Sequence, residues 1–104
     1  MHYEKVNKFI FSTVTWIKRS GKVSLSVTPK HPRAVNKSAS WNQLYLYFQY
    51  HPFYTQVQNQ SRQSSLYNQY ICHVDFAKDR KVPWNLEPWR RDKGYWGFVF
   101  NRCN

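Results

Sequence analysis

Two neighbouring strand patterns near the start of the chain constrain its fold most: the first is rich in aromatic and β-branched residues, and the second alternates apolar and polar residues. They cover Phe9 to Lys18 and Val23 to Thr28, and the turn residues Ser20-Gly21 lie between them. Alternation with a period of two is typical of a strand with one buried face, and a short glycine-containing turn joins two strands into a hairpin. With Arg19 opposite Lys22, the pairs predicted on the buried face are Trp16 with Leu25 and Val14 with Val27.

Length and composition indicate one small folded domain. The chain has 104 residues, enough for a single domain, and 19% of them are aromatic, far more than a disordered segment carries. Residues 1–8 are polar, and we expect them to be frayed. We therefore expect residues 9–104 to form a single basic α+β domain.

The strongest helix pattern lies within residues 34–50. Apolar side chains recur there at helical spacing, and they are Trp41, Leu44, Tyr45 and Phe48. The helix begins either at a capping box at Ser40 or earlier, near Asn36, and it ends before Pro52. Such an aromatic stripe either stacks on bases or packs into the core, and the helical spacing favours the core.

The pattern after residue 55 is less regular. Residues 55–65 are rich in Gln, Asn and Ser, which predicts a loop. The apolar residues that follow fit a helix in part and a strand in part, and we predict a short helix ending near Tyr70, then a strand to Phe76. In a strand His73 and Asp75 project from the same face, whereas in a helix they diverge.

A last strand is predicted from Tyr95 to Arg102, after a turn at Gly94. The elements together predict an α+β fold. Its small antiparallel sheet consists of the N-terminal hairpin and a C-terminal strand, and one or two helices cover it, mainly the helix over residues 36–50.

Several short motifs occur together in this chain. In order, they are Trp16-Ile17-Lys18-Arg19, Ser24-Leu25-Ser26-Val27-Thr28-Pro29, Trp41, Cys72-His73, Trp84-Asn85-Leu86-Glu87-Pro88-Trp89-Arg90 and Arg102-Cys103-Asn104. With these motifs the chain from residue 14 onward resembles a family of small secreted bacterial domains, the domain-of-unknown-function family 2599. The resemblance implies secretion and one compact domain, and it implies no activity. Arg91 stands where members of that family often have proline, which makes this loop more basic.

The sequence contains no run of about 18 apolar residues, so it predicts no transmembrane segment. Residues 1–20 lack the pattern of a signal peptide, because Glu4 and Lys8 interrupt them and no small-residue cleavage site follows. We interpret the chain as a trimmed piece or the last domain of a longer exported protein, and we predict that it is secreted.

The two cysteines, Cys72 and Cys103, lie 31 positions apart. In an exported protein they are expected to form a disulfide, and closing a loop of this length stabilises the fold by roughly 3–4 kcal/mol. Free thiols are the alternative. A zinc site is less favoured, because the paired C-x-x-C spacing is missing. We expect no metal and no other cofactor.

The chain is strongly basic, with sixteen Lys and Arg against five acidic residues and a formal net charge of +11. Such a charge attracts polyanions, although a generally cationic surface without a specific target is the simpler alternative. The residues predicted to bind phosphate or another polyanion are Arg19, Lys81, Arg90, Arg91 and Lys93. If the hairpin cluster and the residue 90–93 cluster lie on one side, Trp84 or Trp89 could stack on bases there.

His73, Asp75 and Glu87 are the candidate catalytic residues. A histidine exchanges protons near neutral pH and a carboxylate can orient it, which is the minimum for metal-independent RNA cleavage. The alternative places His73 in the core beside the disulfide, hydrogen-bonded, with Glu87 bound to backbone amides or to Arg90. The sequence leaves open whether the protein is an enzyme.

These observations predict an exported bacterial effector domain, an antibacterial toxin module that acts on RNA or another polyanion. An acidic immunity protein is an expected partner, and the chain is expected to be monomeric. The alternatives are a non-enzymatic domain that binds the cell envelope, through wall polymer or anionic lipid, and a structural accessory domain without a ligand.

Overall fold

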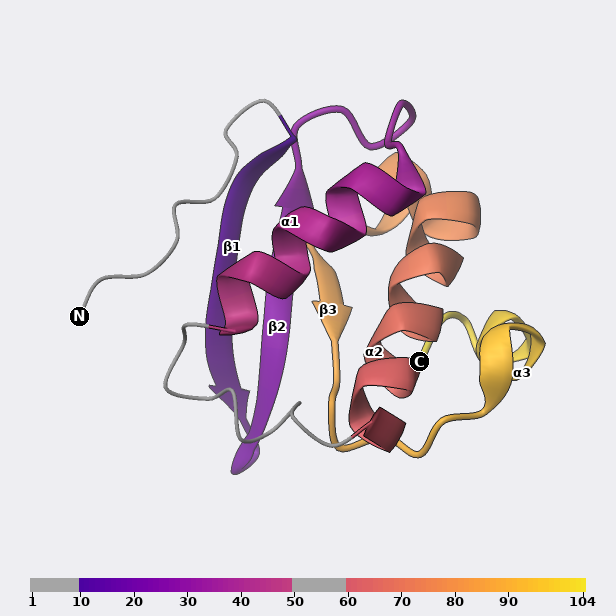
Figure 1. Ribbon diagram of the computed structural model, residues 1–104. Coiled ribbons are helices and arrows are strands. Elements are labelled where there is room, and N and C mark those ends of the chain that lie inside the picture. Colours follow the sequence, from indigo (N-terminus) through magenta and orange to yellow (C-terminus); the bar gives the residue numbers. More distant parts are fainter. Residues whose placement is uncertain (1–9, 50–59) are drawn as a thin grey trace.

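The computed structural model describes residues 10–49 and 60–104 of the chain. A sheet of three antiparallel strands forms one side of the molecule, in the order β1 (Phe11–Arg19), β2 (Lys22–Pro29) and β3 (Trp84–Leu86). Helix α1 (Lys37–Gln49) crosses in front of β1 and β2, and α2 (Gln60–Cys72) runs beside β3 (Figure 1). Helix α3 (Gly94–Phe100) lies beyond α2, on the side away from the hairpin (Figure 1). The predicted α+β class, with an antiparallel sheet and covering helices, is confirmed.

The N-terminal hairpin has the predicted register. Arg19 pairs with Lys22, and the pairs further along are Trp16 with Leu25 and Val14 with Val27. The turn requires positive backbone φ at both Ser20 (53°) and Gly21 (78°), a conformation that matches the twist of a tight hairpin. The buried face of the hairpin supplies Leu25 and Val27 to the core, because both are fully buried.

Helix α1 begins at the earlier of the two predicted positions. The Asn36 side chain accepts a hydrogen bond from the amide of Ala39 (2.9 Å), so Asn36 caps the helix. Leu44 is fully buried, and Trp41 and Tyr45 pack against the core, as the helical spacing predicted. The predictions that involve the Phe48 side chain, Pro52, the frayed residues 1–8 and residues 55–59 lie outside the described part of the chain.

The predicted loop and strand between residues 60 and 76 are wrong. Helix α2 continues to Cys72, and a π-helical turn (His73–Ala77) and a 3-10 turn (Lys78–Lys81) follow it. The polar composition concealed this helix, because its buried face combines apolar and polar side chains. The fully buried members of that face are Ser65, Leu66, Gln69, Tyr70 and His73.

The third strand is β3, which begins eleven residues before the start of the strand predicted at residues 95–102, and that prediction is wrong. Trp84 pairs with Val27 and Leu86 pairs with Leu25, and both β3 side chains are fully buried in the core. Helix α3 forms in place of the predicted strand. Its Phe98 is fully buried, whereas Phe100 is 85% exposed, so two side chains that a strand would place on one face have opposite environments.

Candidate functional site

A polar stripe on α2 holds the segment that contains the Trp-Asn-Leu-Glu-Pro-Trp-Arg motif. The buried side chain of Gln69 donates to the carbonyl of Glu87 (2.9 Å) and accepts from the amide of the same residue (2.8 Å). Ser65, one helical turn earlier, donates from its hydroxyl to the carbonyl of Arg90 (2.7 Å). Buried backbone groups need such partners, so Gln69 and Ser65 fix the course of residues 87–90.

His73 continues this stripe and lies in the interior. Its Nδ1 is 2.7 Å from the carbonyl oxygen of Gln69, and because a carbonyl only accepts, Nδ1 carries the proton. The ring packs against Trp84, with centroids 6.1 Å apart, and its Nε2 has no hydrogen-bond partner among the described residues. Burial, with a smaller effect from the charge of Lys81, lowers the pKa of His73 to about 4. The imidazole is therefore neutral at neutral pH.

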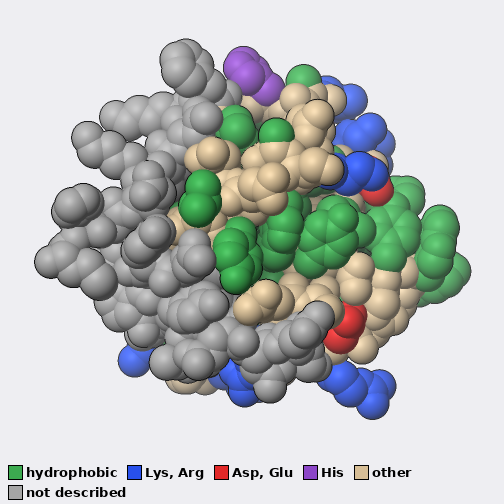
Figure 2. Space-filling view, viewed as in Figure 1, with side chains coloured by type: hydrophobic (Ala, Val, Ile, Leu, Met, Phe, Trp, Pro, Cys, Tyr) green, Lys and Arg blue, Asp and Glu red, His purple; other side chains and the backbone are tan. Residues whose placement is uncertain are grey.

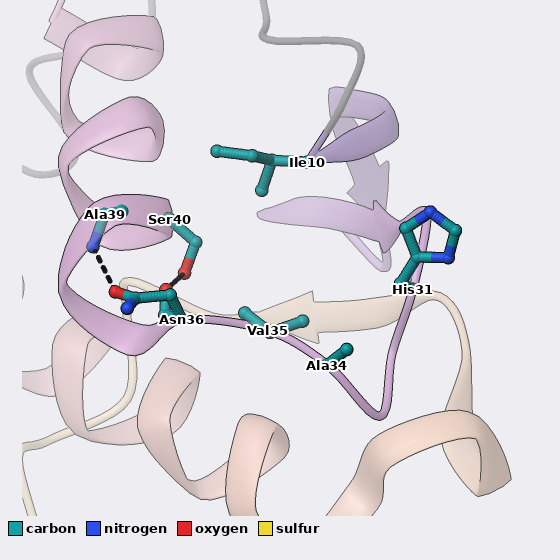
Figure 3. A pocket seen from close by; sticks show the side chains of 7 residues that line it. All are labelled: Ile10, His31, Ala34, Val35, Asn36, Ala39 and Ser40. Atoms are coloured by element: carbon teal, nitrogen blue, oxygen red, sulfur yellow. Dashed lines mark hydrogen bonds between the residues drawn. The ribbon is translucent and has the colours of Figure 1, made fainter.

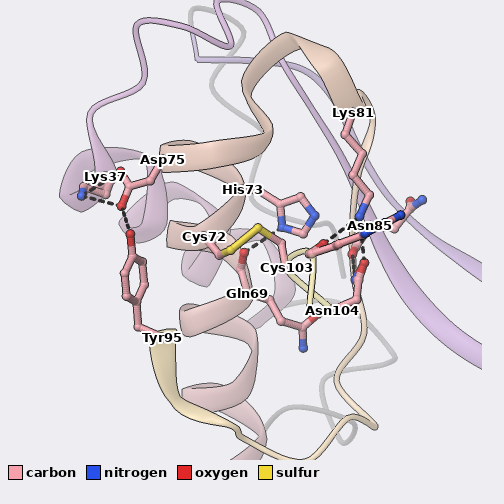
Figure 4. The surroundings of a disulfide bond; sticks show 11 residues. Lys37, Gln69, Cys72, His73, Asp75, Lys81, Asn85, Tyr95, Cys103 and Asn104 are labelled. Atoms are coloured by element: carbon pink, nitrogen blue, oxygen red, sulfur yellow. Dashed lines mark hydrogen bonds and ion pairs between the residues drawn. A yellow bond between two sulfur atoms is a disulfide. The ribbon is translucent and has the colours of Figure 1, made fainter. Parts of the chain in front are cut away.

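The two candidate carboxylates have partners elsewhere. Asp75 points away from His73 and accepts bonds from Lys37 Nζ (3.0 Å) and from the hydroxyl of Tyr95 (2.7 Å) (Figure 4). Burial, together with the hydrogen bond to the Asp75 carboxylate, raises the pKa of Tyr95 to about 12.

Glu87 forms an ion pair with Arg90 three residues later. The three residues proposed for acid–base chemistry thus occupy three separate places, and no hydrogen bond joins any two of them. The arrangement of His73 and Glu87 matches the structural alternative, in which His73 is hydrogen-bonded in the core and Glu87 binds Arg90.

The predicted disulfide between Cys72 and Cys103 is confirmed (Figure 4). It joins the end of α2 to the segment that follows α3, across a separation of 31 residues. Both cysteines are buried and pack with Phe98 in a small second apolar cluster. The disulfide and this cluster therefore attach α3 to the rest of the domain.

The two tryptophans of the motif differ in their surroundings. Trp84 is fully buried, and its indole N–H donates to the carbonyl of Lys78 (2.9 Å). The prediction that Trp84 stacks on bases is therefore wrong, because its strand pairing with β2 places it in the core. Trp89 is partly buried, and Lys22 Nζ and the Arg90 guanidinium lie 4.1 Å and 4.6 Å from the centre of its ring.

Trp89 therefore brings together cations that are far apart in the sequence. Lys22 comes from the hairpin turn and Arg90 from the end of the motif, as the hypothesis of a shared basic side required. We call the group of Arg19, Lys22, Trp89, Arg90 and Arg91 the hairpin-end surface. Arg19 faces Lys22 across the hairpin, and both Arg19 and Arg91 are exposed.

The other predicted polyanion ligands lie nearer the chain end. Lys93 Nζ donates to the main-chain oxygen of Asn104 (2.8 Å). Lys81 Nζ donates to the carbonyl of Arg102 (2.9 Å) and to the Asn104 side chain (3.3 Å). Lys81 and Lys93 thus bind backbone near the chain end, and the five predicted cations form two groups.

Few of the Lys and Arg side chains that the structure describes form ion pairs. Among the described residues, the ion pairs are Arg33 with Asp79, Lys37 with Asp75, and Arg90 with Glu87. The remaining described carboxylate, Asp92, accepts from Asn68 and from the amide of Gly94. Arg19 and Arg91 form no ion pair in the described part of the chain, so their charges face solvent.

Besides a hollow of about 280 Å³ whose lining includes Trp41, Tyr67 and Asp92, two further hollows are lined by described residues. The smaller, of about 150 Å³, lies between the loop after β2 and the start of α1 (Figure 3). His31 is its only titratable lining residue among those described, and its walls are largely aliphatic, so it offers no chemical arrangement. The larger, of about 590 Å³, is lined by Phe76, Ala77, Arg80, Lys81, Val99, Arg102 and Cys103.

Neither a metal site nor a membrane-spanning helix occurs in the part of the chain that the structure describes. Within residues 10–49 and 60–104, no three His, Cys, Asp or Glu side chains gather closely enough to hold a metal ion. None of the helices there has the length and apolar character needed to cross a bilayer.

The sequence analysis missed Ser65 and Gln69, whose side chains hydrogen-bond to the backbone of Arg90 and Glu87 and so position part of the hairpin-end surface. They lie in a segment whose polar composition predicted a loop. The signal that could have identified them is the spacing of Ser65, Gln69 and His73 at i, i+4 and i+8, which is one stripe of a helix.

Comparison with known proteins gives a family and no activity. The family described as "Protein of unknown function (DUF2599)" matches residues 11–104. No curated protein and no solved structure matches the chain.

Proposed function

The chain belongs to the DUF2599 family of proteins of unknown function, and we propose that it is an exported effector domain that binds RNA or a similar phosphate-rich polyanion. The observation that carries the proposal is the meeting of two distant basic segments around Trp89. Lys22 and Arg90 both lie over its ring, Arg19 pairs with Lys22 across the hairpin, and Arg91 follows Arg90 in the sequence.

The hairpin-end surface is rigid enough to be specific in its geometry. Gln69 and Ser65 fix the backbone of residues 87–90, and the hairpin register fixes Arg19 opposite Lys22. Surface cations held on a fixed backbone lose less conformational freedom when they bind phosphate than cations on a mobile tail. Arginine also binds phosphate through two parallel hydrogen bonds, which suits Arg19 and Arg91.

We propose that the domain acts by binding the polyanion, and that His73 does not act as a catalytic acid or base. A general acid or base must reach the substrate proton directly or through one water molecule. His73 is fully buried and neutral. Of the two candidate carboxylates, Asp75 is bonded to Lys37 and Tyr95, and Glu87 is paired with Arg90. As an antibacterial effector, the domain would be neutralised by an acidic immunity protein that covers the same cationic surface.

The test measures the anisotropy of a labelled single-stranded RNA as the protein is added, at several salt concentrations. We expect binding at ~50 mM salt and a steep loss of affinity toward ~200 mM, because phosphate contacts release counterions. The double variant Arg19→Gln/Arg91→Gln should weaken binding and reduce the salt slope by about two, one for each phosphate contact.

The matched control is Arg80→Gln/Arg102→Gln, which removes the same charge from another side of the domain. If both double variants weaken binding equally, net charge alone acts and the hairpin-end surface is not the site. Absence of binding at ~50 mM salt would exclude the polyanion function altogether. RNA that is shortened during the incubation would contradict binding as the mode of action.

A further inference from the structure

Helix α3 carries aromatic side chains that the fold does not bury. Trp96 is 62% exposed and Phe100 is 85% exposed, and at a spacing of i, i+4 they lie on one face of the helix. Tyr95 contacts both Trp96 and Phe76, with ring centroids 5.0 Å and 6.3 Å apart, and Phe76 is itself 49% exposed. We call these four residues the α3 ridge.

The ridge is separate from the side of α3 that packs on the domain. Phe98, on the same helix, is fully buried against the disulfide between Cys72 and Cys103, so the packing requirement of α3 is already met. Figure 2 shows hydrophobic side chains reaching the edge of the molecule where α3 lies. Single exposed apolar residues are normal, but a contiguous group of them marks a contact surface.

Cations border the ridge at the larger hollow, of about 590 Å³, between α3 and residues 76–81. Its apolar lining residues are Phe76, Ala77, Val99 and Cys103, of which Ala77 and Cys103 are buried and Phe76 is exposed. Its remaining lining residues are the cations Arg80, Lys81 and Arg102.

The two guanidinium groups of this border are available to a ligand. Arg80 and Arg102 form no ion pair within the described residues, and Asp79, the carboxylate next to Arg80 in sequence, is paired with Arg33. Lys81 donates to the carbonyl of Arg102, a bond that ties the 3-10 turn to the segment after α3. An apolar hollow with a cationic rim thus lies next to an aromatic ridge.

We infer that the α3 ridge and its cationic border dock on the surface of an anionic phospholipid bilayer. Tryptophan and other aromatic side chains favour the interface between headgroups and acyl chains, where Trp96 and Phe100 would lie. Lys and Arg beside them meet the headgroup phosphates, as Arg80 and Arg102 can. Peripheral binding of this kind needs no helix that crosses the membrane.

Two other occupants fit the chemistry less well. A second copy of the chain would bring the same three cations of the border face to face across a twofold axis, in a protein of formal net charge +11. A nucleic acid has no acyl chain to contact the apolar lining residues of the hollow, which include Ala77, Val99 and Cys103. A phospholipid surface supplies both the negative charge and the apolar phase.

The test compares vesicles of phosphatidylglycerol and phosphatidylcholine, mixed, with vesicles of phosphatidylcholine alone. Binding, measured by cosedimentation, should require the anionic lipid, and the tryptophan emission should shift to the blue on binding. Trp96→Phe should bind and lose most of this shift, because Trp96 is the tryptophan that enters the interface. Phe100→Ser should weaken partitioning by at least about tenfold, whereas the control Leu46→Ser, at an exposed apolar position on α1, should not.

The charge variants make this test independent of the proposed RNA function. Arg80→Gln/Arg102→Gln should weaken binding to anionic vesicles by about fivefold for each arginine, and Arg19→Gln/Arg91→Gln should weaken it less. Equal binding to phosphatidylcholine alone, or an unchanged blue shift in Trp96→Phe, would overturn the inference. Two other outcomes would also overturn the inference. One is a dimer that Phe100→Ser abolishes, and the other is quenching of the tryptophan fluorescence by single-stranded RNA that Trp96→Phe abolishes.

Discussion

Two aromatic segments in the last third of the chain have opposite environments. Trp84 of β3 has no exposed surface, whereas Trp96 of α3 is 62% exposed. From the sequence, Trp84 was a candidate for stacking on bases and residues 95–102 were expected to form a strand of the sheet. The contrast shows that hydrophobicity alone did not decide which aromatic residues enter this core.

Partners supplied by distant elements decide it. Residues 84–90 gain strand pairing with β2 and side-chain hydrogen bonds from Gln69 and Ser65 on α2, so their backbone can be buried. Residues 94–100 satisfy their backbone within a helix and need only one packed side, which Phe98 supplies. The opposite side of α3, with Trp96 and Phe100, is exposed to solvent.

The largest expected effect comes from truncating the buried tryptophan. Trp84→Ala should lower the free energy of unfolding by about 3–5 kcal/mol, because it leaves a cavity in the core and removes the indole bond to Lys78. Trp96→Ala should change it by no more than about 0.5 kcal/mol, the usual range for exposed positions. Urea unfolding followed by far-ultraviolet circular dichroism measures both.

The pair of variants can also break the comparison. Comparable losses in Trp84→Ala and Trp96→Ala would mean that α3 contributes to the core as much as β3 does. If Trp84→Ala does not fold, the milder Trp84→Phe still tests the claim, since it should be destabilised more than Trp96→Phe.

The hairpin was predictable because its signals are local. The Ser20-Gly21 turn and the alternation in Val23 to Thr28 predict the register without help from the rest of the chain, and the structure has that register. The third strand was not predictable in the same way. It is three residues long, and only its pairing with β2 and its cover by α2 make Trp84 and Leu86 core residues.

The candidate site divides along the same line. The disulfide was expected from two cysteines in an exported protein, and the structure contains it. The sequence posed the meeting of two basic segments only as a condition, and the structure brings Lys22 and Arg90 together at Trp89. The catalytic grouping did not form, because the end of α2 continues as a π-helical turn in which His73 and Asp75 diverge. Gln69 was missed because no sequence motif marks a buried glutamine whose side chain bonds to the backbone amide and carbonyl of one residue, as a neighbouring strand would.

The disulfide should matter next most, and mainly to the α3 side of the comparison. Reduction, or the double variant Cys72→Ala/Cys103→Ala, should cost roughly 3–4 kcal/mol through the loop of 31 residues that the bond closes. Hydrogen exchange should accelerate first at α3 and residues 101–104, since the disulfide cluster is their attachment, while β3 keeps its strand pairing. Equal melting temperatures of the oxidised and reduced protein, or β3 exchanging before α3, would contradict this.

The smallest of the three effects concerns His73, which packs on the Trp84 side of the comparison. Its pKa is lowered to about 4 by burial, so the unfolded chain, with an ordinary histidine near 6.5, binds the proton first as the pH falls. The contribution of neutral His73 to the free energy of unfolding is therefore fully present above about pH 6.5. It declines as the pH falls from there to pH 4, with a slope approaching ~1.4 kcal/mol per pH unit, and the total loss is up to about 3 kcal/mol. Asp79 adds to acid sensitivity at lower pH, because its bond to Arg33 lowers its pKa. Unfolding in urea at a series of pH values, with His73→Leu as the reference, isolates the histidine. The variant should remain neutral in the core and lose the slope between pH 4 and 6.5, whereas an equal slope in both proteins would show that His73 is protonated within the folded domain and thus accessible to solvent.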